Sequence, residues 1–210
     1  AAMMPNMPET IAHMLAVSSL GAIWSSCSPD FGIQGVVDRF GQIEPKIFVA
    51  CDGYWYNGKR QEVADKLGPI VDQIAPQAVV IVPLLGQADA IADGVGKAVT
   101  QDRFIADYEA RELTFERVPF SHPLYILFSS GTTGIPKCIV HSAGGTLLQH
   151  LKEHRIHCGL TEGERLFYFT TCGWMMWNWL ASGLAVGATL CLYDGSPFHP
   201  DGNVLFDYAA

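Results

Sequence analysis

Short apolar runs alternate with longer amphipathic segments over the first hundred residues. The apolar runs cover residues 22–26, 46–50 and 78–82. The segments between them have apolar residues at helical spacing and cover residues 8–20, 33–43 and 59–74. Continuous apolar strands separated by helices of about ten to fifteen residues are typical of a parallel sheet covered on both faces. We therefore expect a doubly wound α/β fold, with a mostly parallel sheet and helices on both of its faces.

The pattern becomes less regular after residue 82. Residues 87–99 predict one more helix, weakened by Gly94 and Gly96. A polar connection follows, in which four large aromatic side chains are expected to be buried: Phe104, Tyr108, Phe115 and Phe120. We expect a doubly wound βαβ-type subdomain at residues 1–100, the connection at residues 101–123, and a further portion of the same large domain at residues 124–210.

Residues 174–193 carry no charged side chain, and an uncharged run of this length is formally a candidate membrane helix. Gly183 and Gly187 interrupt the run, and the residues after Gly187 read as a short strand. No Lys or Arg lies close to either end, where topology signals would be expected. A buried helix followed by a buried strand is the better interpretation, and no membrane partner is expected.

Composition and charge narrow the classes of function. The chain is 49% hydrophobic and 16% charged, with a net charge of −8, which argues against binding of nucleic acid by bulk electrostatics. Any anion must therefore be held by local donors. The six cysteines show no C-x-x-C spacing, and the N-terminal residues do not resemble a signal peptide. Buried thiols in a reducing compartment, the cytosol, are the expected arrangement.

The segment FSSGTTGIPK, residues 128–137, carries the chemistry of this sequence. It has the glycines, hydroxyls and lysine of a phosphate-binding loop, but Pro136 and Cys138 stand where a P-loop has its second glycine and its Ser or Thr. β-type runs lie on both sides, at residues 124–128 and 138–141, and Pro136 is incompatible with a helix interior. The chain is therefore expected to run strand, loop, strand.

This loop offers many hydrogen-bond donors in a short space. Gly131 and Gly134 allow a tight turn and a close approach of backbone N–H groups to a ligand, and Lys137 adds a positive charge. An ordinary turn between strands is the alternative for a shorter match, but the full ten-residue string favours phosphate binding. The residues expected to hold phosphate are Ser129, Ser130, Gly131, Thr132, Thr133, Gly134 and Lys137.

Three segments resemble one family of enzymes. The string FSSGTTGIPK resembles the signature loop [ST]-S-G-T-T-G-x-P-K of the adenylate-forming enzymes, which include the acyl-CoA synthetases, the luciferases and the adenylation domains of peptide synthetases. The following KCIVHSAGG and the early MPNMPETIAHMLAVSSLGAIWSSCSPDFG resemble the acetyl-CoA synthetase branch. The segment TCGWMMWNW, residues 171–179, is most similar to the members that activate acetoacetate.

The resemblance implies an ATP-dependent acid–CoA ligase acting in lipid metabolism. A short carboxylate, acetoacetate first, would attack the α-phosphate of Mg²⁺-bound ATP, and CoA would then displace AMP from the acyl-adenylate. The seven loop residues would hold the phosphates that leave as pyrophosphate. Two alternatives stay open: a ligase for another short-chain acid, and a nucleotide-binding module without turnover.

The same resemblance implies that several functional parts lie outside these 210 residues. The adenine- and Mg²⁺-binding motif, the ribose-binding Asp and the C-terminal lid domain with its acyl-activating Lys follow later in the family, and none is found here. The catalytic residue therefore cannot be named. We expect these residues to be part of the large N-terminal domain, to depend on the remainder of the chain as a partner, and not to catalyse adenylation alone.

The aromatic segment is the candidate acyl pocket. By resemblance, the residues that wall the carboxylate site are Trp174, Met175, Met176, Trp177 and Asn178. Simple core packing is the alternative, because clusters of aromatic residues and methionines are usually core. Asn178 needs a hydrogen-bond partner if it is buried. A helix cap or backbone contact would supply one, and the functional hypothesis is that its amide donates to the 3-oxo oxygen of the substrate.

Histidines recur near one helical face at His150, His154 and His157, followed by Cys158. The H-E-x-x-H pattern is absent, and the charged residues between them indicate a solvated face, so no metal site is expected. Ser142 is interpreted as a helix N-cap and not as a nucleophile. His141 is interpreted as a packed histidine at the end of a strand.

Overall fold

The computed structural model describes residues 1–129 and 134–210. Contacts divide the chain into two compact units. Unit 1 comprises Ala1–Pro5, Cys27–Arg111 and Asp194–Ala210, and unit 2 comprises Asn6–Ser26 and Glu112–Tyr193. Each unit is built from segments that are distant in the sequence, and each is described below by itself.

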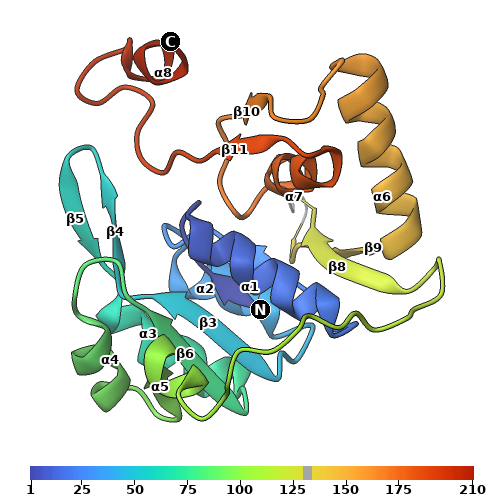
Figure 1. Ribbon diagram of the computed structural model, residues 1–210. Coiled ribbons are helices and arrows are strands. Elements are labelled where there is room, and N and C mark those ends of the chain that lie inside the picture. Colours follow the sequence, from blue (N-terminus) through green and yellow to red (C-terminus); the bar gives the residue numbers. More distant parts are fainter. Residues whose placement is uncertain (130–133) are drawn as a thin grey trace. The chain divides into compact units, whose positions relative to one another are not determined.

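Unit 1 is organised around a five-stranded sheet with the strand order β2-β1-β3-β6-β7 (Figure 1). The strands are β1 (Ala2–Met3), β2 (Ser26–Cys27), β3 (Ile47–Cys51), β6 (Ala78–Val82) and β7 (Ala98–Thr100). The pairs β1–β3, β3–β6 and β6–β7 are parallel, and Ile47 lies opposite Ala78 in the central pair. The mixed α/β fold with a mostly parallel sheet is confirmed.

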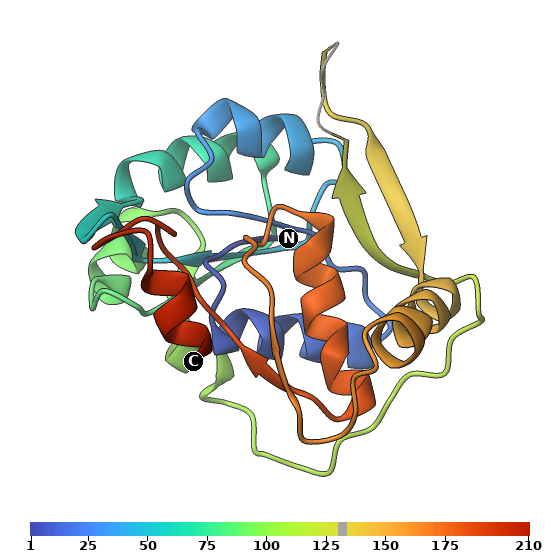
Figure 2. The same ribbon diagram turned by 90° about the horizontal axis from the view of Figure 1, so that it is seen from above.

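Helices pack on this sheet and close its core. They are α2 (Ile33–Phe40), α3 (Ala64–Ile74), α4 (Ala88–Gly94) and α5 (Gln101–Ile105). Helix α8 (Val204–Ala209) also belongs to unit 1 and has no buried residue. Figure 2 shows α2 and α3 side by side along the sheet. Phe40 of α2 meets Phe48 of β3 edge to face, with ring centroids 6.1 Å apart, and both side chains are fully buried. Burial of such apolar side chains is the main stabilising contribution to this unit.

A β-hairpin replaces the start of the helix predicted at residues 59–74. Strands β4 (Gly53–Tyr56) and β5 (Lys59–Glu62) pair antiparallel, and helix α3 begins only at Ala64. Asn57 and Gly58 both have positive φ, at 51° and 68°, as the two-residue turn of a hairpin requires. The Asn-Gly pair is a strong hairpin signal, and it outweighed the helical spacing that follows it.

Three further expectations about unit 1 and its borders were wrong. The helix predicted at residues 87–99 ends at Gly94, and β7 follows because the β-branched residues there can pair with β6. The strand predicted at residues 22–26 is reduced to an isolated bridge at Trp24 and the short β2. In the connection, the aromatic residues predicted to be buried are exposed by 37–72%: Phe104, Tyr108, Phe115 and Phe120.

Unit 2 combines a hairpin, helices and a small sheet (Figure 1). Its elements are α1 (Pro8–Ser19), β8 (Pro123–Phe128), β9 (Cys138–Ser142), α6 (Ala143–Lys152), the π-helical turn η1 (Glu153–His157), β10 (Arg165–Phe167), α7 (Met175–Ala181), the 3-10 turn η2 (Ser182–Val186) and β11 (Thr189–Cys191). Strands β8 and β9 are antiparallel, and β10 and β11 are parallel.

The uncharged segment of residues 174–193 forms helix α7, the turn η2 and strand β11, so the expected order of helix and strand is confirmed. Leu180 and Val186 from this segment pack with Leu160 and Leu166 in the small core of unit 2. Gly187 ends η2 in the left-handed conformation, with φ of 79°. Within residues 1–129 and 134–210, none of the helices combines the length and apolar character that crossing a bilayer demands.

Candidate functional site

The hairpin β8–β9 carries the candidate phosphate loop at its tip. The backbone N–H of Ser129 donates to the carbonyl oxygen of Lys137 at 2.9 Å. In return, the backbone N–H of Lys137 donates to Ser129 Oγ, also at 2.9 Å. These two bonds join the chain next to the ends of β8 and β9, so the two predicted strands are confirmed, and the Ser129 hydroxyl has a structural partner.

Most of the described part of the loop is open to solvent, although Pro136 is buried. Gly134 has φ of 144°, a conformation that a side chain would strain, as expected for a tight approach of backbone. Ile135 is 66% exposed, and Lys137 is exposed as well. Ser130, Gly131, Thr132 and Thr133 lie outside the described residues. Phosphate binding by the seven loop residues therefore stays a prediction, and the exposed Gly134 and Lys137 are compatible with it.

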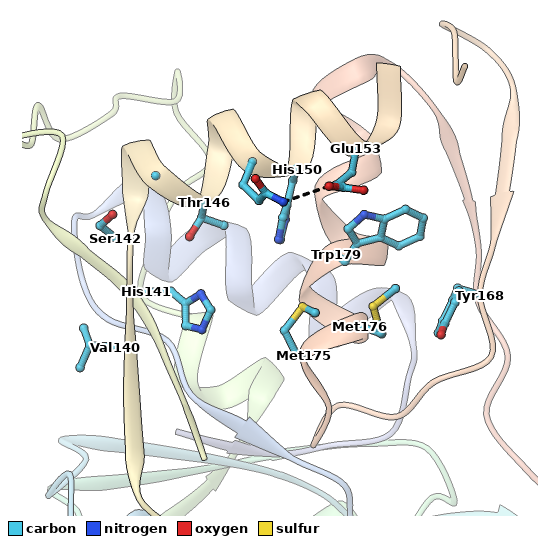
Figure 3. Close-up of a pocket in the computed structure, with 12 residues that line it drawn as sticks. Val140, His141, Ser142, Thr146, His150, Glu153, Tyr168, Met175, Met176 and Trp179 are labelled. Atoms are coloured by element: carbon cyan, nitrogen blue, oxygen red, sulfur yellow. Dashed lines mark hydrogen bonds between the residues drawn. The ribbon is translucent and has the colours of Figure 1, made fainter. Parts of the chain in front are cut away.

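A cavity of about 720 Å³ lies beside this hairpin in unit 2 (Figure 3). Its walls come from the end of β9, one face of α6, the start of η1 and one face of α7. The residues that line it are Val140, His141, Ser142, Gly145, Thr146, Gln149, His150, Glu153, Tyr168, Met175, Met176 and Trp179. Neither Lys nor Arg is among them, so the cavity suits a ligand end without strong negative charge.

The predicted pocket residues on and beside helix α7 do not all lie in the cavity: some line it, one is exposed and one is in the core. Met175 and Met176 line the cavity, at the start of the helix. Trp174 precedes the helix and is 65% exposed. Trp177 points into the core instead, where its ring stacks on Trp24 with centroids 6.4 Å apart and its Nε1 donates to Asn6 Oδ1 at 2.9 Å. Only the two methionines of the predicted set therefore reach the cavity.

Asn178 is buried with its side-chain amide unpaired in the described part of the chain. Only 1% of the residue is exposed, and neither its amide nitrogen nor its amide oxygen has a hydrogen-bond partner among the described residues. The predicted cap or backbone contact is thus missing from that part of the chain. Asn178 does not line the cavity. A buried amide without partners costs about 1–3 kcal/mol, so this position is either a strained feature or one that something else completes.

His150 and His154 are buried, although the charged residues around them indicated a solvated face. His150 is 6% exposed and lines the cavity, whereas His154 is fully buried behind it. The two rings meet edge to face with centroids 6.5 Å apart. The prediction was wrong because α6 continues into the π-helical turn η1, which turns His154 inward while Arg155 and His157 stay exposed.

Burial keeps these imidazoles neutral. Loss of hydration, together with the nearby His154 and His141, lowers the pKa of His150 to about 4, and the carboxylate of Glu153 opposes this only in part. Burial also lowers the pKa of His141 and of His154. A neutral imidazole has one donor and one acceptor nitrogen, so His150 can bind an uncharged polar group. In residues 1–129 and 134–210, no group of three or more His, Cys, Asp or Glu side chains could hold a metal ion.

Comparison with known proteins shows the family to which the fold and the hairpin belong. The model of the family described as AMP-binding enzyme matches residues 1–210, so this chain belongs to that family. The resemblance seen in the sequence is confirmed. The chain is 75% identical over 210 residues to an acetoacetyl-coenzyme A synthetase of Rhizobium meliloti (strain 1021), covering 100% of this chain and 32% of that protein.

Other proteins similar to this chain are also CoA synthetases. An acetoacetyl-CoA synthetase of Mus musculus is 51% identical over 209 residues, covering 97% of this chain and 31% of that protein. A malonamoyl-CoA synthetase of Penicillium aethiopicum is 46% identical over 200 residues, covering 92% of this chain and 28% of that protein. The solved acetoacetyl-CoA synthetase from Streptomyces lividans superimposes with a TM-score of 0.91 at 42% identity, covering 99% of this chain and 31% of that one. The chain spans about a third of the length of these relatives.

Proposed function

We propose that the complete enzyme containing this chain is an acid–CoA ligase that activates acetoacetate. ATP and the carboxylate would give an acyl-adenylate and pyrophosphate, and CoA would then take the acyl group and release AMP. The identity of 75% with an acetoacetyl-coenzyme A synthetase over the whole chain carries this proposal. The cavity supports it, because a pocket without cationic side chains fits the neutral 3-oxo end of the substrate better than a second carboxylate.

The loop of residues 129–137 is proposed to hold the β- and γ-phosphates. Exposed backbone N–H groups, hydroxyls and the ammonium of Lys137 are suitable donors for phosphate oxygens. Mg²⁺ is proposed to enter as the ATP complex, and CoA as the second substrate. Residues 124–210 would thus contribute the phosphate loop and part of the acyl pocket, with residues 1–100 as the supporting subdomain and 101–123 as the connection.

The acyl group is proposed to lie against Met175 and Met176, which wall the cavity opposite α6 (Figure 3). A second candidate substrate is malonamate, because one relative is named a malonamoyl-CoA synthetase. Acetoacetyl and malonamoyl groups both carry a carbonyl at C3 and differ only in a methyl or amino group beyond it. The feature shared by the two candidate substrates is therefore the 3-oxo oxygen.

The substrate is tested on the complete enzyme with acetoacetate, malonamate, butyrate and acetate. Pyrophosphate release that depends on the acid and on ATP, followed by formation of the acyl-CoA, is expected with acetoacetate at the highest kcat/KM. If kcat/KM is highest with malonamate, the proposed substrate is malonamate and not acetoacetate. If no carboxylate gives pyrophosphate release, the ligase proposal is wrong and the alternative, a nucleotide-binding module without turnover, is favoured.

The loop is tested by Lys137→Ala. Removing a charge-assisted contact of about 1.5–3 kcal/mol is expected to lower kcat/KM for ATP about 10- to 100-fold. The melting temperature should stay the same, because the Lys137 side chain is exposed. Lys46→Ala is the matched control, since Lys46 is an exposed lysine just before β3 in unit 1. Equal kinetics of the two variants would contradict a phosphate role for this loop.

Two further expectations belong to this proposal. The 210-residue chain alone should not catalyse pyrophosphate exchange, because the family's later motifs are not among its residues. Exchange by the purified 210-residue protein would contradict this. The cytosol is proposed as the compartment, and the six cysteines support it because none of them forms a disulfide. Cys27, Cys51 and Cys172 are buried as expected, whereas Cys138 and Cys158 are exposed, contrary to the expectation of buried thiols.

A further inference from the structure

One wall of the cavity carries an imidazole without a structural role of its own. Figure 3 shows the His150 ring pointing from α6 into the cavity, towards the side formed by Met175. Its Nδ1 is buried out of reach of solvent and has no hydrogen-bond partner among the described residues, so a ligand in the cavity cannot contact this atom. Nε2 is the ring nitrogen that can meet a ligand, and it can carry the single proton of the neutral ring.

We propose that His150 determines specificity for 3-oxo acids by donating a hydrogen bond to the 3-oxo oxygen of the acyl group. This inference rests on the proposed ligase function and adds the residue that recognises the substrate. The methyl end of acetoacetate would meet Met175 and Met176, which offer soft apolar contacts. The polar 3-oxo oxygen would then face the polar His150, and the apolar methyl end would face the two methionines.

His154 holds this imidazole in place. Its Nε2 lies 3.1 Å from the carbonyl oxygen of Trp179 and 2.9 Å from Ser182 Oγ. Because a carbonyl oxygen only accepts, Nε2 carries the proton and donates. The His154 ring also packs on Trp179, with centroids 4.4 Å apart, and meets His150 edge on. His154 is thus a positioning residue, fixed to α7 and η2, against which the ring of His150 rests.

The other polar groups of the cavity are less suited to this contact. The amide nitrogen of Gln149 already donates to Glu153 Oε1 at 2.9 Å (Figure 3). Tyr168 is 41% exposed at the other side of the cavity, and its ring packs on Trp179. Asn178, the donor predicted from the sequence, does not line the cavity. His150 therefore combines three properties that the proposed contact needs: burial, a place on the wall and a ring nitrogen, Nε2, that can donate to a ligand.

The charge state fits a carbonyl ligand. The groups that face His150 are His141 from β9, and His154 and Glu153 from η1. The two neighbouring imidazoles disfavour a positive charge on His150, so its ring stays neutral at physiological pH. A neutral imidazole binds a carbonyl oxygen through one N–H and gains nothing from a second carboxylate, which favours 3-oxo acids over dicarboxylic acids.

The test compares acetoacetate with butyrate, which has the same chain length and no 3-oxo group. In the complete enzyme, His150→Phe is expected to lower the ratio of kcat/KM for acetoacetate to that for butyrate about 10-fold or more, mainly through acetoacetate. His150→Gln keeps an N–H donor and should restore part of the ratio, which a merely structural role would not explain. His157→Phe, at an exposed histidine of η1, is the control and should leave the ratio unchanged.

The outcomes distinguish a failure of the proposed role of His150 from a failure of the proposed ligase function. A ratio within about twofold of the wild type in both folded His150 variants overturns the role of His150 and leaves the ligase proposal intact. If His150→Phe fails to fold, His150→Gln decides alone: a lowered ratio that still favours acetoacetate supports the contact, and a ratio within about twofold of the wild type overturns it. Absence of adenylation by the wild-type enzyme with every short acid overturns the proposed function, and the role of His150 with it.

Discussion

Buried polar groups are treated differently in the two units of this chain. In unit 1, the fully buried Asp52 accepts backbone N–H bonds from Leu84 and Leu85 through Oδ1 and from Gln87 through Oδ2, all at 2.7–2.8 Å. In unit 2, both amide atoms of Asn178 and Nδ1 of His150 are buried without partners in the described residues. Asp52 thus holds the fold of unit 1, whereas unit 2 keeps some buried polar atoms unpaired, one of them on a residue that lines the cavity.

The difference shows how stability and function are distributed. An unpaired buried polar atom costs folding free energy, and natural structures keep few of them. Their cost in unit 2 is balanced elsewhere, here by fully paired groups such as Asp52 and by the apolar core of unit 1. Substituting a paired buried group such as Asp52 should therefore lower stability, whereas substituting an unpaired one such as Asn178 should raise it.

The largest effect is expected for Asp52→Ala. The substitution removes the acceptor of three backbone N–H groups and leaves them without partners, so the free energy of unfolding should fall by about 3–5 kcal/mol. Chemical denaturation of the complete enzyme, followed by tryptophan fluorescence, measures this change.

Asp93→Ala is the control for that variant. Asp93 also belongs to unit 1, but its side chain is 75% exposed and only pairs with Arg103 at 3.7 Å. Exposed ion pairs contribute little, so a change below about 0.5 kcal/mol is expected. If Asp52→Ala were equally mild, the carboxylate would not be holding the turn after β6.

A medium effect is expected for the pH dependence of stability. In the unfolded chain the imidazole of His150 has its ordinary pKa of 6.5, whereas in the folded protein the pKa is lowered to about 4. Between these values the unfolded state binds more protons, so stability is complete above pH 6.5 and is lost as the pH falls towards 4. The neighbours that set this pKa are His154, His141 and Glu153.

The measurement is the slope of unfolding free energy against pH for wild type and His150→Phe. The variant should lose a pH-dependent contribution of about 2 kcal/mol, less than the full pKa difference would give because water reaches the cavity. His157→Phe should keep the wild-type slope, since His157 is exposed. Parallel slopes for wild type and His150→Phe would show that His150 is not held neutral by burial.

The sequence was sufficient where one local signal dominated. The apolar run Ala78–Val82 became strand β6, next to the central strand β3, with the predicted bounds, and Pro136 correctly excluded a helix after the candidate phosphate loop. Gly187 marked the turn between η2 and β11. Each of these features depends on the preferences of a few neighbouring residues, which a sequence shows directly.

The sequence was insufficient where two signals competed or where distant segments meet. The Asn57-Gly58 turn stood against helical spacing, and the hairpin formed. The inward position of His154 depends on the π-helical turn and on contacts with Trp179 and Ser182, which come from a segment more than twenty residues away. Charge alternation in the sequence gave no sign of these contacts, so the cavity wall formed by His150 was missed.

The smallest and most discriminating effect is expected for Asn178→Leu. Leucine has nearly the same shape as asparagine, and it removes two buried polar atoms that have no partner among the described residues. The free energy of unfolding should therefore rise by about 1 kcal/mol, although most substitutions at buried positions lower it. Urea denaturation of the complete enzyme measures this change.

Asn6→Leu is the matched comparison, because Asn6 is a second buried asparagine of unit 2 that is fully engaged. Its Oδ1 accepts from Trp177 Nε1 at 2.9 Å, and its Nδ2 donates to the carbonyl oxygen of Tyr193 at 3.3 Å. The same substitution there should lower stability by about 1–3 kcal/mol, because it leaves the indole N–H and the carbonyl unpaired. A loss of stability in both leucine variants would mean that the remainder of the enzyme supplies partners for Asn178, and that this residue supports the fold just as Asn6 does.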